Sequence, residues 1–319
     1  MPPIMLSRVA ESLYWMARQV ERAENMARFL EVTQTFDLDQ PGTEINPWWP
    51  LVQVTADTKK FEKVYGVANA NNVRQFIAFD REYHSSMLSM LAMARQNVRS
   101  VRETVSSEAY EAINDLYQCV KTASRNPDSI ADDFLNRVRE LAIQWTGVIE
   151  TTLPRDLPWH FVNIGRLIER ADKTSRILDV KYFQLLPQSQ GVASAIDDLQ
   201  WATLLRACSG IEAYRRKHQF IRVNQVVEFF LFDTAHPRSV LACVRGLRDS
   251  LNAVVQLSNR QTESEACHAA DALIEHLENH SAERVIAGGM HEFVDDLQTR
   301  LNAVGNALGN DYLYHGTAA

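Results

Sequence analysis

The sequence predicts an all-α protein, and three observations support this prediction. Apolar residues recur every three or four positions through most of the 319 residues, which is the spacing of one face of an amphipathic helix. Glycine and proline are scarce, with 12 and 10 residues. Alternating β-branched strands joined by Asn-Gly or Asp-Gly turns are missing. We therefore expect a multi-helix bundle.

The first half should begin with a long helix over residues 6–32, followed by a polar loop over 33–46. Pro47-Trp48-Trp49-Pro50 then opens a second helix that runs to about Tyr65, because proline in a first turn lacks only an N–H that has no helical partner there. After a short amphipathic piece, VRQFIAFD, three longer helices are expected near 85–104, 106–124 and 129–152.

The second half repeats this order after the break at Leu153-Pro154-Arg155-Asp156-Leu157-Pro158. The stretch WHFVNIGRLIERADKTSRILDVKYF resembles the opening helix, at a constant offset of 148 positions. Further helices are expected near 263–279 and 282–308. We interpret the pattern as two tandem repeats of about 150 residues that pack about a pseudo-two-fold axis.

The predicted domain boundaries follow from this repeat. Residues 1–153 form the first helical repeat, and residues 154–308 form the second, packed on the first as one body. Residues 309–319 should be a frayed C-terminal tail, because untethered termini rarely become ordered.

Charge and cysteine usage exclude several classes of protein. A net charge of −7 argues against a partner such as nucleic acid or an anionic membrane, because such binding depends on concentrated Lys and Arg. The 4 cysteines are far apart and lack C-x-x-C spacing, which disfavours a disulfide framework and fits a reducing cytoplasm. No run approaches the roughly 18 apolar residues of a membrane span. We expect a soluble cytoplasmic protein.

The Glu-Arg segment of the opening helix carries the candidate site. Glu24 lies at the centre of the apolar face, four positions before Arg28, which is the favourable order for a helical ion pair. Arg18 precedes Glu21 by one turn and can pair with it, whereas Arg22 points away from the apolar face. An unpaired buried carboxylate is costly, so arginines of the same helix or of the other repeat should neutralise it.

The second copy has the same geometry, with Asp172 centred on an apolar face. Two interpretations remain open: a buried ion network that fixes how the halves dock, or a polar cleft that grips a carboxylate or phosphate and orients an amine or a proton. The candidate acids are Glu21, Glu24, Glu169 and Asp172. The candidate binding residues are Arg18, Arg22, Arg28, Arg166, Arg170 and Arg176.

Metal and cofactor signals are weak. His276 and His280 have i,i+4 spacing but no H-E-x-x-H motif, and Glu265-x-x-His268 is a single di-iron-like motif where two are needed. The HPRS stretch at 236–239 fits a helix-capping turn better than an anion site. No Gly-rich phosphate loop is present, so we expect neither a metal nor a cofactor.

The two ER helices, together with HPRSV and VRGLRDSL, resemble the bacterial alpha-E family over nearly the whole chain. The family motif falls on Glu21-Arg22 and Glu169-Arg170. Members of this family are typically encoded beside, or fused to, circularly permuted ATP-grasp proteins, often with a transglutaminase-like protease nearby. Because ATP-grasp enzymes join carboxylates to amines, the resemblance implies a role in amide or peptide formation.

Three functions follow as expectations. The first is an accessory or substrate-recognising subunit of an ATP-grasp-type ligase. The second is a stand-alone enzyme on peptide or amide substrates, with Glu21 or Glu24 as general base. The third is a purely structural helical scaffold. Whether the chain has any activity of its own stays open at this stage.

Overall fold

The computed structural model describes residues 5–39, 46–55, 57–127, 133–185, 195–258 and 264–313. Within these ranges every regular element is a helix, so the all-α prediction is confirmed. None of the described helices combines the length and the apolar composition needed to cross a membrane.

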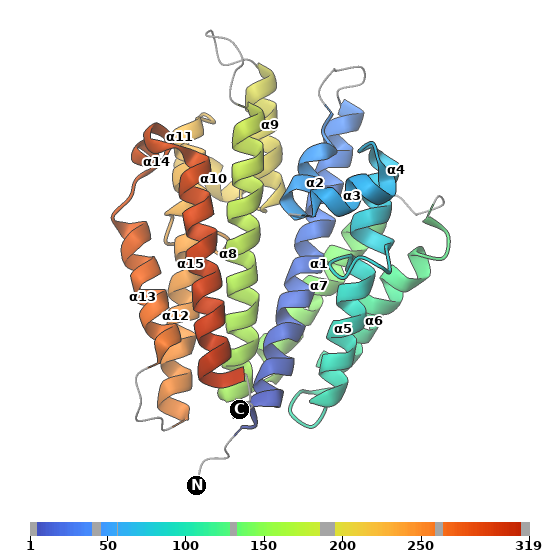
Figure 1. Ribbon diagram of the computed structural model, residues 1–319, viewed down its shortest axis with the longest axis vertical. Coiled ribbons are helices and arrows are strands. Elements are labelled where there is room, and N and C mark those ends of the chain that lie inside the picture. The colour runs from blue at the N-terminus through green and yellow to red at the C-terminus, as the bar shows by residue number, and fades with distance from the viewer. Residues whose placement is uncertain are drawn as a thin grey trace.

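Two long helices lie side by side at the centre of the molecule, α1 (Ser7–Asp39) and α8 (Leu157–Leu185) (Figure 1). Gly165 of α8 allows this contact, because a Cβ atom at that position would lie 2.3 Å from the carbonyl oxygen of Tyr14 in α1. The two backbones therefore approach each other directly, and the ER segments of both helices face the same interface.

One group of helices packs on each side of this central pair. The helices that follow α1 are α2 (Trp49–Thr55), α3 (Thr58–Tyr65), α4 (Ala70–Arg74), the π-helix η1 (Gln75–Phe79), α5 (Met87–Ser100), α6 (Ser107–Ala123) and α7 (Phe134–Thr152). Those that follow α8 are α9 (Ala195–Ala207), α10 (Ile211–Lys217), α11 (Val223–Leu231), α12 (Val240–Leu257), α13 (Glu265–Glu278), α14 (Ala282–Gly288), α15 (Met290–Leu308) and the π-helix η3 (Gly309–Leu313).

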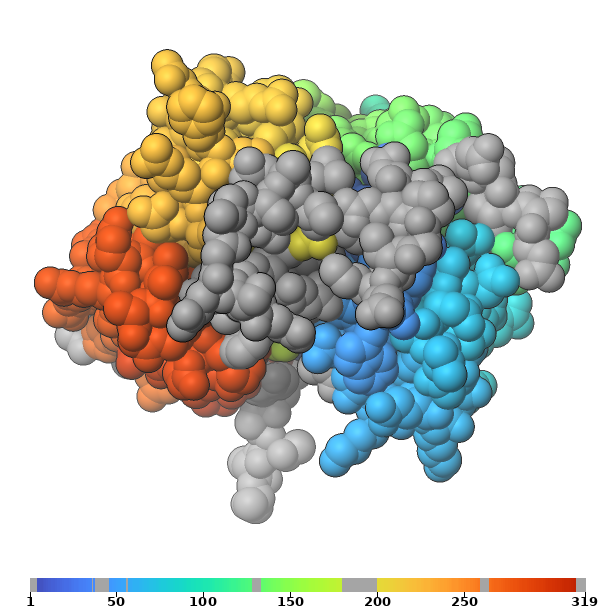
Figure 2. Space-filling model, turned by 90° about the horizontal axis from the view of Figure 1, so that it is seen from above, coloured from blue at the N-terminus to red at the C-terminus, as the bar shows by residue number. Residues whose placement is uncertain are grey.

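The two groups have matching arrangements. Helices α1, α5, α6 and α7 pack together on one side, and α8, α12, α13 and α15 pack together on the other. The view from above places the blue and cyan helices α2 to α4 opposite the yellow to red segments of the second group (Figure 2). The duplication and its pseudo-two-fold axis stay predictions that this arrangement does not by itself establish.

A single hydrophobic cluster runs through both groups. Its largest fully buried side chains include Tyr14 of α1, Trp145 of α7, Phe161 of α8 and Phe229 of α11. Since both long helices contribute to this cluster, the ER segments are fixed within a continuous core.

Several predicted boundaries were wrong. Helix α1 continues to Asp39 through half of the expected loop, and the region expected as one helix up to Tyr65 forms α2 and α3. The expected helix over 282–308 is broken into α14 and α15 at Gly289, whose φ of +110° is a left-handed conformation that favours glycine. The start of the helix expected at 129 lies outside the described residues.

The prediction of a frayed tail was wrong for residues 309–313. These residues form η3, in which Leu313 is buried. The Asp311 carboxylate accepts hydrogen bonds from the Ser264 hydroxyl at 2.8 Å and from the Ala266 N–H at 3.0 Å. Asp311 therefore helps to cap α13, which ties η3 to the bundle. Residues 314–319 lie outside the described ranges.

Candidate functional site

The two Glu-Arg motifs bind each other reciprocally across the α1–α8 interface. Arg170 of α8 donates from Nε and Nη2 to the two carboxylate oxygens of Glu21, both at 2.8 Å. Arg22 of α1 donates to both oxygens of Glu169, with Nη2 at 2.8 Å from Oε2. Each pair is bidentate, which is the strongest geometry for a guanidinium and a carboxylate.

Glu169 has further cationic partners. Arg18 donates from Nε to Glu169 Oε2 at 2.9 Å, and its Nη2 lies 2.9 Å from the same oxygen. The ammonium of Lys173 lies 3.6 Å from Oε1. The pairing of Arg18 with Glu21 that the sequence allowed is not the one formed, because Arg18 binds Glu169 of the other helix instead.

Glu24 is neutralised by two arginines. Arg28 donates to its Oε1 from Nε at 2.8 Å and from Nη2 at 2.6 Å, which confirms the predicted i,i+4 pair. Arg238, just before α12, donates to the same oxygen from Nη2 at 2.8 Å and to the Asn25 side chain from Nη1 at 2.9 Å. Its Nη1 also lies 3.4 Å from Glu21, so Arg238 links both acids of α1.

Asp172 is neutralised within its own helix. Lys173 donates to its Oδ2 at 2.9 Å, and Arg176 donates to Oδ1 at 2.9 Å. Because Lys173 also approaches Glu169, it links the two acids of α8 as Arg238 links those of α1.

The burial of these residues corrects the expectation that Arg22 points away from the buried face of α1. Glu21 and Glu169 have side-chain exposures of 2% and 0%, against 12% for Asp172, so the motif acids are at least as buried as the central ones. Arg22 does not point away from the interface, because its guanidinium lies on the fully buried Glu169. A helical wheel of α1 alone could not show this, because α8 covers the flank as well as the apolar face.

Nearby cations keep the two motif acids, Glu21 and Glu169, ionised. Burial alone would raise the pKa of Glu21, but the charges of Arg170 and Arg238 outweigh burial and lower it to about 2. Burial likewise opposes ionisation of Glu169, yet Arg22, Arg18 and Lys173 hold its pKa well below the usual value. A carboxylate with so low a pKa is a weak general base at neutral pH.

Arg166, the remaining candidate, lies outside these clusters. Its Nη2 donates to Asn163 at 2.7 Å and to Glu150 of α7 at 3.2 Å. Burial, and then repulsion by Arg170, lowers its pKa. The structure thus brings together all of the candidate acids and five of the six candidate arginines.

Two residues of the clusters were missed by the sequence reasoning. Lys173 directly follows Asp172 in the sequence, and this adjacency is a signal that the lysine lies close to the candidate acid. Arg238 belongs to the HPRS stretch, where Ser239 does cap α12 by accepting a hydrogen bond from Ala242 N–H at 3.1 Å, as expected. The sequence reasoning interpreted this stretch only as a helix cap, and so did not predict that Arg238 in the same turn binds α1.

We call the eleven charged residues of the two clusters the ER network. Its acids are Glu21, Glu24, Glu169 and Asp172, and its basic residues are Arg18, Arg22, Arg28, Arg170, Lys173, Arg176 and Arg238. Seven cations face four carboxylates in a largely buried region. The excess of positive charge favours a site that accepts an anion.

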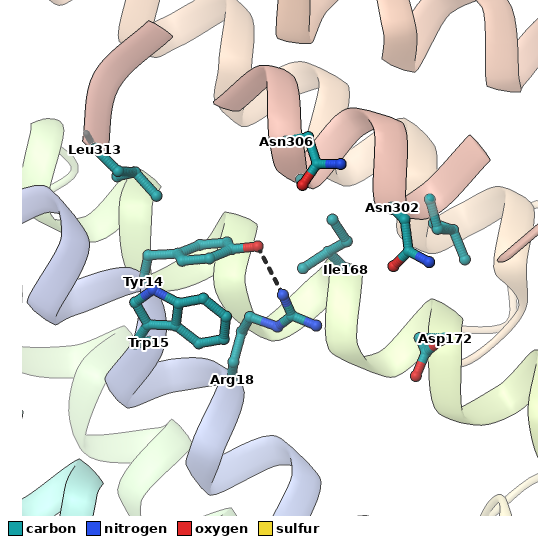
Figure 3. A pocket seen from close by; sticks show the side chains of 10 residues that line it. Tyr14, Trp15, Arg18, Ile168, Asp172, Asn302, Asn306 and Leu313 are labelled. Atoms are coloured by element: carbon teal, nitrogen blue, oxygen red, sulfur yellow. Dashed lines mark hydrogen bonds between the residues drawn. The ribbon is translucent and has the colours of Figure 1, made fainter. Parts of the chain in front are cut away.

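A cavity of about 230 Å³ adjoins the ER network (Figure 3). It lies between α1, α8, α15 and η3, and its lining includes Tyr14, Trp15, Arg18, Asn302 and Asn306. Arg18 donates to the Tyr14 hydroxyl from Nη1 at 3.0 Å and points into this space. Burial alone would lower its pKa, but the Glu169 carboxylate outweighs burial and raises it, so Arg18 remains a cation.

Metal ligation finds no support in the described ranges, where no three His, Cys, Asp or Glu side chains form a cluster suited to a metal ion. His276 and His280 are in ring contact at 4.5 Å, and His276 stacks on Phe293. The pair thus packs against an aromatic side chain.

Fold and site together define a class of protein: an all-helical protein in which two Glu-Arg motifs meet at a central helix pair. A family model described as "a predicted alpha-helical domain with a conserved ER motif" matches residues 5–313. The chain belongs to this family, Alpha-E.

The similar proteins found do not carry an assigned activity. Uncharacterised proteins of Mycobacterium bovis and of two strains of Mycobacterium tuberculosis are 27% identical over 265 residues. The match covers 76% of this chain but only 29% of each relative, so the chain spans less than a third of their length. No solved structure matches the chain.

Proposed function

We propose that this chain is an accessory, substrate-recognising subunit of an ATP-grasp-type carboxylate-amine ligase that forms amide or peptide bonds. The observation that carries the proposal is the excess of fixed cations in the ER network, with Arg18 facing the adjoining cavity. A guanidinium held in place by Glu169 is preorganised to bind a carboxylate. The ligase itself is suggested by the resemblance to alpha-E proteins.

The length of the relatives also supports this proposal. Because the matched region is less than a third of each relative, the helical domain in those proteins is joined to a large amount of further sequence. A domain that works together with other domains suits an accessory role better than an independent one.

The stand-alone enzyme is less well supported. Its general base would be Glu21 or Glu24. The lowered pKa of Glu21 makes it a weak base, and one oxygen of Glu24 is already hydrogen-bonded to two arginines. The scaffold interpretation has firmer support, since the reciprocal Glu-Arg pairs join α1 to α8. We assign that structural duty to the motif acids, and recognition to Arg18, the cation that faces the cavity.

Co-expression and co-purification with an ATP-grasp-type ligase from the same organism test the proposal. Co-expressed proteins should elute as one complex, and amide formation should be slower when the chain is left out. Separate elution together with an unchanged rate would refute the accessory role.

A further inference from the structure

The cavity at Arg18 has a closed counterpart elsewhere in the molecule. Arg166 follows Arg18 by 148 positions, and Glu150 precedes Asn306 by 156 positions. The offset of 148 positions also relates the other α1 residues of the cavity to residues of α8. The offset of 156 positions relates the α15 residues of the cavity to residues of α7. The counterpart is lined by Trp145, Thr146, Ile149, Glu150, Trp159, Val162, Asn163 and Arg166.

In the closed site the protein supplies its own carboxylate. Glu150 accepts a hydrogen bond from Arg166, and the buried Ile149 fills the space beside it. No room remains there for a water-sized molecule. The anion-binding capacity of Arg166 is therefore used within the fold.

In the open site both of these groups are missing. Gly305 stands where the closed site has Ile149, and the neutral Asn306 stands where it has Glu150. Arg18 uses Nε and Nη2 for Glu169 and Nη1 for Tyr14. A guanidinium has five N–H groups, so one on each terminal nitrogen of Arg18 is left for another acceptor.

We infer that the open site binds the carboxylate of a small organic acid. Arg18 binds this carboxylate in the position that corresponds to the Glu150 carboxylate beside Arg166. The rest of the lining sets the size and polarity of this acid. Apolar surface comes from Tyr14, Trp15, Ile168, Leu301 and Leu313, and amide groups come from Asn302 and Asn306. The lining also includes the Asp172 carboxylate, whose charge Lys173 and Arg176 neutralise. About 230 Å³ suits a molecule of amino-acid size with an apolar body.

This inference deepens the proposed function and rests on it for its biological purpose, because the carboxylate would be that of the ligase substrate. Two sources share the same chemistry: a free amino acid and the C-terminus of a peptide. The binding step itself needs only this chain, so it can be measured without a ligase.

The experiment is calorimetric titration of the full chain with L-leucine, glycyl-L-leucine and L-leucinamide. The amino acid or the dipeptide should bind, and the tighter of the two identifies the source. L-Leucinamide should bind at least about ten-fold more weakly, because it lacks the carboxylate. Binding of leucinamide as tight as that of the tighter-binding acid, or no binding of any probe at millimolar concentration, would overturn the inference.

Matched variants locate the site. Asn306→Glu recreates the internal carboxylate and should weaken binding at least about ten-fold, whereas the equally long, neutral Asn306→Gln should retain it. Gly305→Ile should abolish binding by filling the cavity. Gly305→Ala should not, because its Cβ would make ordinary contacts of 3.6 Å with Ile168 and Tyr14.

Thermal melts of each variant separate lost binding from lost folding. If Asn306→Glu and Asn306→Gln bind alike, the carboxylate is not held at this site and the inference fails. If the probes bind as expected but the ligase rate is independent of the chain, the carboxylate site stands and the accessory function fails.

Discussion

Glu169 is a fully buried carboxylate that three basic groups keep charged: the guanidinium groups of Arg18 and Arg22 from α1, and the ammonium group of Lys173. Removing its charge leaves buried cations without an anion. Glu169→Gln should therefore lower the free energy of unfolding by about 3–5 kcal/mol, the usual cost of breaking a buried ion pair from one side. Urea denaturation followed by circular dichroism measures this change.

Glu140 provides the matched control. It pairs with Arg137 on the surface, where the two side chains are 54% and 55% exposed. Glu140→Gln should change the free energy of unfolding by less than about 1 kcal/mol, because exposed ion pairs are weak. An equal effect at both positions would contradict the burial and charge assigned to Glu169.

Acid should weaken the fold through Glu21. Its pKa is about 2 in the folded protein, below the ordinary value of 4.5. A carboxyl whose folded pKa is depressed contributes stability above its unfolded pKa and loses it as the pH falls towards the folded pKa. The stability difference between the wild type and Glu21→Gln should therefore shrink between pH 4.5 and about 2.

Denaturant titrations of both proteins across this range measure that difference. A stability difference between the wild type and Glu21→Gln that stays constant with pH would mean that the carboxyl of Glu21 has the same pKa in the folded and unfolded states.

The ion pairs that the sequence predicted correctly lie within one helix. The Glu24–Arg28 pair follows from i,i+4 spacing, which is a property of the helix alone. The partners of Arg18 and Arg238 lie 151 and 214 positions away. These contacts depend on how α1, α8 and the turn before α12 pack, and no local spacing contains that information.

At the scale of elements, the contact between α1 and α8 depends on a glycine. A Cβ at Gly165 would meet the backbone oxygen of Tyr14 at 2.3 Å, and a backbone atom cannot move aside as a side chain can. Gly165→Ala should force the helices apart and lower the free energy of unfolding by about 1–3 kcal/mol, as overpacking does.

Substitution of Gly147 in α7 by alanine should have the opposite effect on stability. It is exposed within a helix, and nothing lies within 4 Å of an added Cβ. Gly147→Ala should raise the free energy of unfolding by about 0.5–1 kcal/mol, because alanine has the higher helix propensity. Thermal melts that shift in the same direction for both variants would contradict the close approach at Gly165.

Helix existence was more predictable than helix ends. Periodicity identified the long helices, but α1 runs past its expected end, and Gly289 breaks a stretch whose apolar pattern continues on both sides. The order of residues 309–313 comes from Asp311 and Leu313, whose partners belong to distant elements. Such contacts override local composition.

For the whole molecule, the shared core predicts cooperative unfolding. The hydrophobic cluster includes α5 of the first group and α12 of the second, and the ER network joins the helices between them. The most protected amides of α5 and α12 should therefore exchange hydrogen with the same opening free energy. A large difference between the two would show that the halves unfold independently.

If Arg18 beside the ER motifs recognises the carboxylate substrate of an amide-forming ligase, its loss should weaken the binding of that substrate. The most direct test is the steady-state rate of the co-purified ligase with wild-type chain or with Arg18→Gln. Arg18→Gln should raise the KM for the carboxylate substrate roughly ten-fold or more and change kcat by less than about two-fold. An unchanged KM in a complex that remains assembled would contradict it.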